Sequence, residues 1–389
     1  MHRNIKLLKW FNFFLDFRPY APVAIIYFAF VTHSYALALG VYSVTHIASA
    51  LFEVPTGVFS DLMGRKKTIV CGAIASTLSL IFFAVGGSFE ILAVGGVFEG
   101  LARAFFSGNN DAFLYDTLKE GQKETELSEW LGKTGAMFQV GLGISAVIGG
   151  FIAESSLSIV MWLSVLPQCI TIFLALKMRD VRVDTGEEST NIFRHLGEAL
   201  NGFRKNFQLR MISLASIIDY AIEETMYQFY PVFFATLWPT WAIGLVRALS
   251  HVCSGLGFWF AHKLIKQFNA FRLLIGGELY MRTVGLLSVL FPGVLSPLLL
   301  SIDTHGLRMV AQDTLIQERF SNKERATMGS LNSFLGSILF AISAYGIGYI
   351  ADIFSPAYAI LVAQITLFIV VILYWLAYKS SASQTRHLL

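Results

Sequence analysis

The sequence predicts an all-α membrane protein with twelve transmembrane helices in two pseudo-symmetric bundles of six. Three observations lead to this fold class. Of the 389 residues, 55% are hydrophobic and only 14% are charged, whereas soluble domains carry about 25% charged residues. Apolar segments of about 20 residues, long enough to cross the ~30 Å hydrocarbon core, recur along nearly the whole chain. The two halves also repeat each other, so we expect the lipid bilayer to surround this chain.

The first half contains six predicted helices, at 10–32, 36–60, 68–87, 90–115, 128–153 and 157–178. The second half contains six more, at 207–235, 239–263, 270–290, 294–317, 326–351 and 355–378. The loops between them are short except after Lys177, where a polar segment and a basic amphipathic stretch predict a cytosolic linker. We therefore predict an N-terminal bundle over 1–178, the linker over 179–206 and a C-terminal bundle over 207–389.

The positive charges predict the orientation, because loops on the cytosolic side retain Lys and Arg. Of the 29 Lys and Arg residues, 24 lie in the termini and in alternate loops, and the other loops contain none. Both termini are therefore expected to be cytosolic in a multi-pass protein of the cytoplasmic (inner) membrane. The N-terminal stretch lacks a small-residue cleavage site, so we expect it to lead into the first span.

The repeat is visible in two short matches near equivalent helix ends. Residues 115–118 (YDTL) match 312–315 (QDTL), and residues 149–154 (GGFIAE) match 347–352 (IGYIAD). Six helices separate the copies, so both copies have the same orientation in the membrane. Parallel six-helix repeats are a transporter architecture.

A motif at the cytosolic end of the second helix carries a family resemblance. Residues 57–67 (GVFSDLMGRKK) are similar to the signature G-x-x-x-D-x-x-G-R-[RK] of the major facilitator superfamily. Residues 53–56 (EVPT) and 107–116 (SGNNDAFLYD) resemble a bacterial branch of permeases and efflux pumps. The resemblance covers the whole chain and implies a secondary transporter that works by alternating access.

The resemblance also implies a latch on the cytosolic side. Asp61 would bind the start of the eleventh helix near 325–327, because a carboxylate accepts hydrogen bonds from exposed helix amides. Arg65 would pair with Asp116. The alternative is that the basic residues 65–67 only set the topology.

Two glycines belong to the same motif, and the second half of the chain lacks the motif's aspartate. Gly57 and Gly64 are expected to permit close backbone approach and a tight turn. In the second copy Ala261 stands where the aspartate would be. The latch is therefore expected on one side only.

Charged residues inside the spans are the candidate site, because each costs about 2.5–3.5 kcal/mol near the bilayer centre. In the superfamily, helices 1, 4, 7 and 10 line the cavity, and these helices carry most of the charges. The predicted substrate and proton cavity comprises Arg18, Glu53, Arg103, Asp111, Asp219, Glu223, Arg247 and Arg308.

The roles within this set remain open. Asp219, Glu223 or Asp111 could carry a proton, since loss of water favours the neutral form of a carboxylate, or could form ion pairs with Arg103, Arg247 or Arg308. The arginines have a separate set of possible roles, which concern anionic groups of the substrate.

Arg18 and Arg103 could bind a carboxylate or phosphate of the substrate through the guanidinium fork, or form buried salt bridges. Glu53, before a proline, could be a gating partner or a capping group. Glu99, Arg103 and Asn110 are expected on one face of an uninterrupted fourth helix.

Other classes of protein fit the sequence poorly. Residues 132–134 (GKT) resemble the end of a phosphate-binding loop, but Leu127 replaces the required glycine. His-Glu-x-x-His, Gly-x-Ser-x-Gly and metal-spaced Cys/His sets are absent from the sequence, so we expect neither an enzyme nor a cofactor. The scattered basic residues argue against nucleic acid.

We therefore predict a monomeric carrier of a small-molecule substrate with protons as the coupling ion. Proton-coupled export of a small organic solute is favoured, and proton-coupled uptake of a polar or amphoteric metabolite is the alternative. A transporter-like sensor that binds without translocating is a third possibility.

Overall fold

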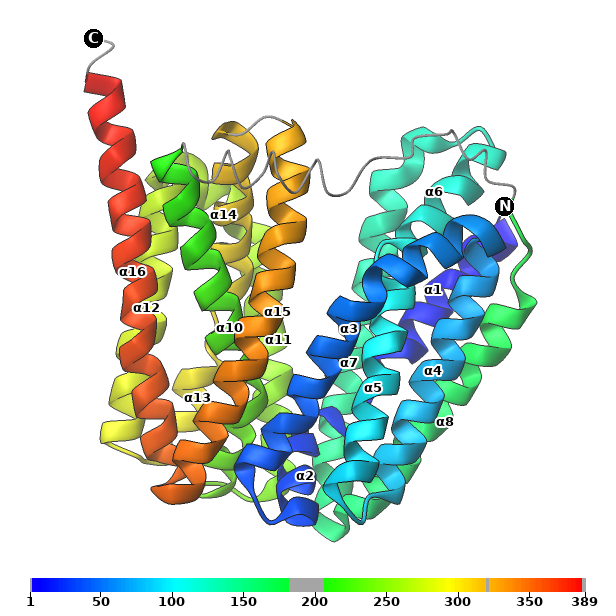
Figure 1. The fold of residues 1–389 in the computed structure, drawn as a ribbon, viewed down its shortest axis with the longest axis horizontal. Helices are drawn as coiled ribbons and strands as arrows, with labels where there is room; N and C mark the ends of the chain where they lie inside the picture. The colour runs from blue at the N-terminus through cyan, green and yellow to red at the C-terminus, as the bar shows by residue number, and fades with distance from the viewer. Residues whose placement is uncertain (1, 182–205, 320–321, 387–389) are drawn as a thin grey trace. The chain divides into compact units, whose positions relative to one another are not determined.

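The computed structural model of this chain describes residues 2–181, 206–319 and 322–386 (Figure 1). By packing, the chain divides into two compact units. One consists of Met1–Glu187 with Trp238–Ala248, and the other consists of Glu188–Leu237 with Leu249–Leu389. Most of the predicted linker lies outside the described residues, so the predicted domain boundaries remain a prediction.

The first unit consists of helices in the order α1 (His2–Asp16), η1 (Ala21–Val23), α2 (Ala24–Thr32), α3 (Tyr35–Met63), α4 (Arg65–Val85), α5 (Phe89–Phe106), α6 (Asn109–Glu120), η2 (Glu124–Glu126), α7 (Leu127–Ser155) and α8 (Leu157–Lys177). In this unit α1 packs against α7 and α8, while α5 packs between α3 and α4. Buried side chains of α1, α4, α6 and α8 form one apolar core.

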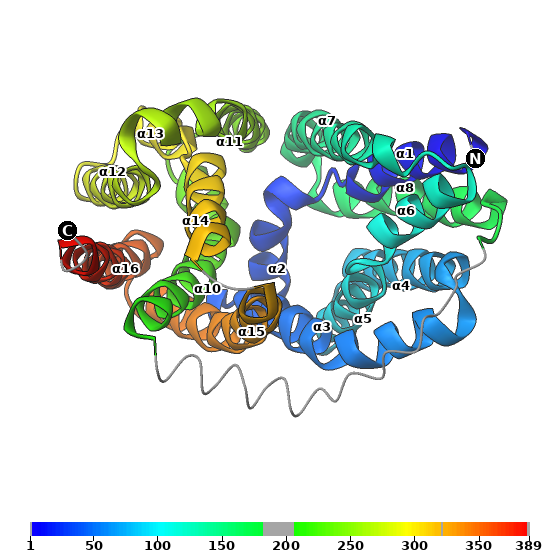
Figure 2. The same ribbon diagram turned by 90° about the horizontal axis from the view of Figure 1, so that it is seen from above.

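The second unit contains α10 (Phe207–Ala235), α11 (Thr240–Phe268), α12 (Ala270–Leu290), α13 (Ser296–Ser301), α14 (His305–Arg319), α15 (Asn322–Ile353) and α16 (Pro356–Arg386), although the start of α11 packs with the first unit. In Figure 2, α16 lies beside both α10 and α12, and α14 lies beside α12. This arrangement brings side chains of α10, α12 and α14 together.

In the described part of the chain these elements form the twelve predicted helices, but three of the twelve are broken in two. The first breaks at Pro19, which lacks an amide hydrogen and restricts Arg18 before it. The fourth breaks at Gly108, whose φ of +66° is left-handed. The tenth breaks before α14, where Asp303 accepts a hydrogen bond from the amide of His305 at 2.7 Å.

The uninterrupted fourth helix expected from the sequence is therefore wrong. Because the chain turns at Gly108 and α6 restarts at Asn109, the register that put Glu99, Arg103 and Asn110 on one face does not continue through the break. Glu99 and Arg103 still share a face of α5, since both precede the break.

Nine helical segments among the described residues are long and apolar enough to cross a membrane. The other predicted spans are the fourth, seventh and tenth helices. All three carry clustered charges, which lower their hydropathy. Three helices with a weak membrane signal thus carry Glu99, Arg103, Asp219, Glu223 and Arg308 of the candidate site.

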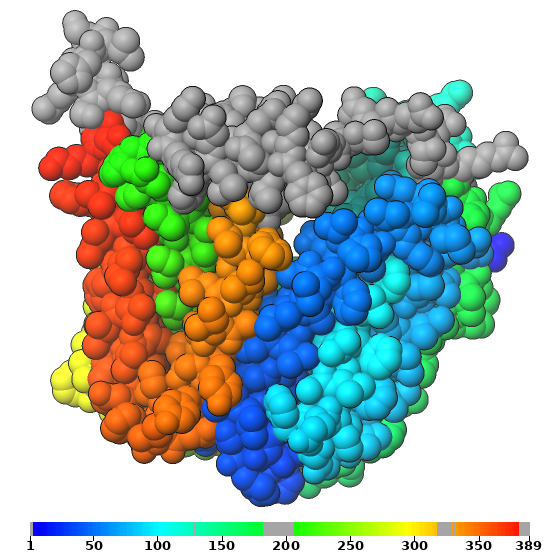
Figure 3. Space-filling model, viewed as in Figure 1, coloured from blue at the N-terminus to red at the C-terminus, as the bar shows by residue number. Residues whose placement is uncertain are grey.

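Close backbone contact joins α3 and α5, which lie side by side on one face of the first unit in Figure 3. A Cβ atom at Gly100 would lie 2.5 Å from the carbonyl oxygen of Thr45 and 2.6 Å from the Cβ of Ala48. Gly96 lies one turn earlier, and a Cβ atom there would be 2.9 Å from the carbonyl oxygen of Val41. Two glycines on one face therefore allow these helices to touch.

Replacing Gly100 with Ala is expected to lower the free energy of unfolding by about 1–3 kcal/mol, because the added methyl group overlaps the α3 backbone. Gly57→Ala is the matched control. A Cβ at Gly57 meets no atom within 4 Å, so alanine there should be neutral or stabilise the helix by up to ~1 kcal/mol. Denaturant unfolding in detergent measures both variants, and equal losses would refute the packing argument.

Candidate functional site

A cluster of five charged side chains lies inside the second unit. Asp219 and Glu223 come from α10, Glu278 and Arg282 from α12, and Arg308 from α14. Both Asp219 oxygens accept from Arg308 Nη1 at 3.4 Å, and Glu223 Oε1 accepts from Arg308 Nη2 at 3.2 Å. Arg308 Nη1 also donates to Glu278. One guanidinium thus contacts three carboxylates.

The second guanidinium closes the network. Arg282 donates to Glu223, and its Nη2 lies 3.6 Å from Glu278 Oε2. The side chains of Arg282 and Glu278 are fully buried, whereas those of Asp219 and Glu223 are 20% and 17% exposed. The acids on α10 are therefore the ones that retain access to solvent.

A glycine on α12 permits this approach of α14. A Cβ atom at Gly277 would lie only 2.8 Å from Cγ of Arg308. The Thr304 hydroxyl, just before α14, also donates to the Gly277 carbonyl at 3.4 Å. Because Gly277 has no side chain, the stem of Arg308 packs closely against α12, and its guanidinium reaches the acids of α10 and α12.

The network holds three carboxylates and two guanidiniums, an excess of one negative charge when all are ionised. Of the three acids, Asp219 is held most weakly. Its only ion pair in the described structure is to Arg308 at 3.4 Å, whereas Glu223 and Glu278 each contact both arginines. Asp219 is therefore the acid that a proton can neutralise with the least loss of ion pairing.

A smaller polar cluster lies inside the first unit. Glu99 Oε1 on α5 accepts from Arg18 Nη1 at 2.5 Å and from Arg103 Nε at 3.4 Å. The Arg103 side chain is 42% exposed, compared with 13% for Arg18. Glu99 Oε2 is buried and makes no hydrogen bond to any residue that the structure describes.

The break in the first helix fixes the position of Arg18. The Leu15 carbonyl accepts from Arg18 Nε at 2.9 Å and from Gln168 Nε2 on α8 at 3.0 Å. Ser76 accepts from Arg18 Nη2 at 3.3 Å and donates to Gln168 Oε1 at 2.9 Å. Gln168 of α8 and Arg18 itself thus satisfy the carbonyl that the broken helix leaves free, and Ser76 of α4 orients the guanidinium.

The motif residues form a third group at the junction of α3, α4 and α6. Arg65 Nε lies 3.7 Å from Asp116 Oδ2, the pairing that the family resemblance implies, and Arg65 Nη1 lies 3.5 Å from Asp61 Oδ1. Asn109 donates to the Arg65 carbonyl at 3.2 Å. Gly64 has a φ of +92°, so the expected tight turn is present.

One expectation for the motif is not met, and a second concerns side chains outside the described residues. The close approach expected at Gly57 is absent from the described structure, because this glycine lies within α3 with open space around its Cβ position. The partner expected for Asp61 is at 325–327 in the other unit, and those side chains lie outside the described residues. The Asp61 side chain is 63% exposed.

Two of the remaining predicted cavity residues lie outside both clusters. Glu53 on α3 and Asp111 on α6 are exposed and form no ion pair within the described residues. Arg247 is 5% exposed on α11, in the segment that packs with the first unit. Its predicted pairing with Asp219 or Glu223, which belong to the second unit, stays a prediction.

The predicted cavity did not include Glu278 and Arg282, because they lie on the ninth predicted helix and the prediction centred on the first, fourth, seventh and tenth. A signal was present: an acid and a base four residues apart within a predicted span. The prediction also missed Ser76 and Gln168, which are uncharged and have no distinguishing spacing.

In the described part of the chain, the twelve predicted helices in two units, with ion pairs buried within each unit, define a polytopic membrane protein. The chain belongs to the Major Facilitator Superfamily, whose family model matches residues 10–344. It is therefore a multi-pass, non-enzymatic secondary transporter.

Curated relatives match only part of the chain. An uncharacterised MFS-type transporter of Methanocaldococcus jannaschii is 30% identical over 111 residues, which cover 28% of this chain and 27% of the relative. Tetracycline resistance protein, class E, of Escherichia coli is 25% identical over 126 residues, which cover 32% of this chain and 29% of the relative. The chain thus aligns with less than a third of the length of these relatives.

The likeness to solved structures extends over the whole chain. The crystal structure of nucleoside transporter NupG matches with a TM-score of 0.80 and 14% identity, covering 97% of this chain and 99% of the other. At this identity the match shows a shared fold.

Proposed function

We propose that this protein exports a small organic solute across the cytoplasmic membrane by alternating access and that protons drive the export. The excess carboxylate in the α10–α12–α14 network is the observation that carries the proposal. A proton on Asp219 leaves two carboxylates for two guanidiniums, so the network is balanced when protonated. Loss of that proton restores a buried negative charge, which is costly away from water.

The first unit supplies the groups that would contact the solute. Arg103 is the most exposed member of the Arg18–Glu99–Arg103 cluster, and its guanidinium fork suits a carboxylate or phosphate. Glu99 Oε2 has no hydrogen-bond partner among the described residues, and in this proposal it accepts from a donor group of the solute. These groups favour an acidic or amphoteric solute over a purely lipophilic cation.

Export is favoured over uptake because one matching relative is named for tetracycline resistance. Both termini lie in the cytosol in this proposal, as the distribution of Lys and Arg predicts, and one chain is sufficient for transport.

Reconstituted proteoliposomes test the coupling. A thermal-shift screen of metabolites, siderophores and antibiotics, with tetracycline as the first probe, selects the solute. A pH-sensitive dye inside the vesicles then records proton movement during solute flux. Flux that neither moves protons nor responds to a pH gradient would refute coupling, and gradient-driven movement of protons and solute in the same direction would favour uptake.

We also propose that Asp61 latches the cytosolic side. Asp61→Asn should weaken the latch and raise the population of the inward-open state, because an amide binds helix amides less strongly than a carboxylate. The measurement is labelling of a Thr327→Cys variant, in a background without Cys71, Cys169 and Cys253, by a membrane-impermeant maleimide. We expect labelling to rise by a factor of about 5, corresponding to ~1 kcal/mol.

Glu120→Gln is the control for this experiment, because it removes an exposed acid from the end of α6. It should leave labelling at the wild-type rate. Equal labelling of the Asp61→Asn and wild-type backgrounds would show that Asp61 does not hold the cytosolic side.

A further inference from the structure

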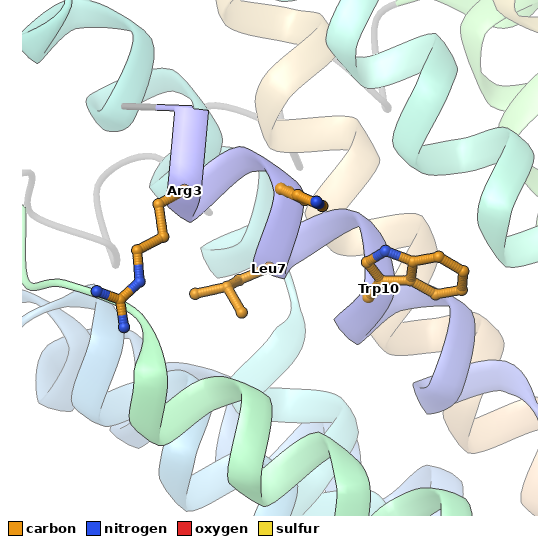
Figure 4. Close-up of a pocket in the computed structure, with 4 residues that line it drawn as sticks. Arg3, Leu7 and Trp10 are labelled. Carbon is orange, nitrogen blue, oxygen red and sulfur yellow. The ribbon is translucent and has the colours of Figure 1, made fainter.

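The first turns of α1 have two different faces. One face packs into the apolar core through Ile5, Leu8 and Phe11, which are at most 2% exposed. The other face opens onto a shallow recess at the surface of the first unit. Arg3, Lys6, Leu7 and Trp10 line this recess, and Figure 4 shows Arg3, Leu7 and Trp10 along successive turns of the helix.

Hydrogen bonds to the end of α8 hold this part of α1 in place. Asn4 Nδ2 donates to the Arg179 carbonyl at 3.1 Å, and Asn4 Oδ1 accepts from the Arg179 amide at 2.9 Å. Arg3 also donates to the Lys177 carbonyl at 3.5 Å. The recess is therefore supported by a reciprocal amide pair and does not depend on a free helix end.

Length places the recess at the membrane surface. The first candidate span runs over 30 residues, Arg3–Thr32. A hydrocarbon core of ~30 Å accommodates about 20 of these residues. Trp10 then lies near the interface, where tryptophan is enriched, and Arg3 and Lys6 lie at the depth of the headgroups.

The charges and rings of the recess are complementary to a lipid. Within the described residues no carboxylate pairs with Arg3 or Lys6, whereas Lys123 and Lys133 each pair with a glutamate. Below them, the Trp10 ring packs against the rings of Phe13 and Phe14 at 5.7 and 6.2 Å between centroids. The positive charges of Arg3 and Lys6 are thus followed along the helix by aromatic rings, a pattern found at lipid-facing interfaces.

We propose that this recess binds one anionic phospholipid of the cytosolic leaflet. Arg3 and Lys6 bind the phosphate and the charged headgroup, and Leu7 and Trp10 contact the glycerol and the upper acyl chains. The site is separate from the proposed transport function. Its place in the cytosolic leaflet rests on the proposed orientation. Lipid binding itself can be measured without knowing the orientation or the transport function.

The experiment is native mass spectrometry of the purified full chain titrated with phosphatidylglycerol or phosphatidylcholine. The wild type should bind one phosphatidylglycerol in preference to phosphatidylcholine. The double variant Arg3→Gln/Lys6→Gln should weaken phosphatidylglycerol binding about thirtyfold, since each basic residue near a lipid headgroup contributes ~1 kcal/mol. Trp10→Ala should weaken binding several-fold with all charges intact.

Lys263→Gln/Lys266→Gln is the matched control. It removes two exposed positive charges with the same spacing at the end of α11 and should leave the preferred site unchanged. Equal weakening by both double variants would mean diffuse attraction to positive charge and would overturn the proposal. Full displacement of the lipid by soluble glycerol phosphate, together with no effect of Trp10→Ala, would also overturn it, because the ligand would then be a free anion.

Discussion

Asp219→Asn is expected to abolish the proton dependence of transport and to leave solute exchange intact. Asparagine keeps the shape of the side chain and stays neutral, so the ionised network then holds two carboxylates and two guanidiniums. The protein should then cycle without releasing a proton. We expect gradient-driven accumulation of solute to fall roughly tenfold or more, within the usual coupling range of ~1–3 kcal/mol.

Two assays in the same proteoliposomes separate these effects. Net flux against a pH gradient measures coupling, and exchange of labelled for unlabelled solute at equal pH measures the conformational cycle. Glu224→Gln is the matched control, because Glu224 is an acid on α10 that bonds to Gln228 at 2.8 Å outside the network. The Glu224→Gln variant should retain both activities. If transport by the Asp219→Asn variant remained coupled to protons, Asp219 would be excluded as the proton carrier.

Arg308→Gln is expected to be the most destabilising substitution in the second unit. Arg308 contacts three carboxylates and is 5% exposed. Its loss would leave three acids with one guanidinium inside the protein. Breaking a buried ion pair from one side costs about 3–5 kcal/mol, and we expect a loss of that size in the free energy of unfolding.

Charge balance can be tested by restoring it. Adding Glu278→Gln to Arg308→Gln leaves Asp219 and Glu223 with Arg282, the same excess of one acid as in the wild type. The double variant should recover a substantial part of the lost stability, measured by denaturant unfolding in detergent. Arg272→Gln, exposed at the start of α12, should change stability by less than ~0.5 kcal/mol. A double variant no more stable than Arg308→Gln would show that packing, and not charge, decides the loss.

Hydropathy, charge distribution and one motif were enough to predict the twelve helices and the family. They were enough because the bilayer forces each span to be long, apolar and helical, and these properties can be read locally. The pairing of Arg65 with Asp116 was also within reach, since the family motif names both positions. Proline and glycine in the sequence could have indicated the breaks at Pro19 and Gly108, but many membrane helices tolerate either residue.

By itself, the sequence determined the fold class and the identity of the charged residues within the spans. Only the tertiary structure decided which charges meet. It brings Glu278 and Arg282 of α12 to Asp219, Glu223 and Arg308. Helix periodicity defines the face of one helix, whereas an ion pair between helices depends on their rotation and separation. Those are fixed by packing details such as Gly277 beneath the stem of Arg308, which a pattern along the chain does not contain.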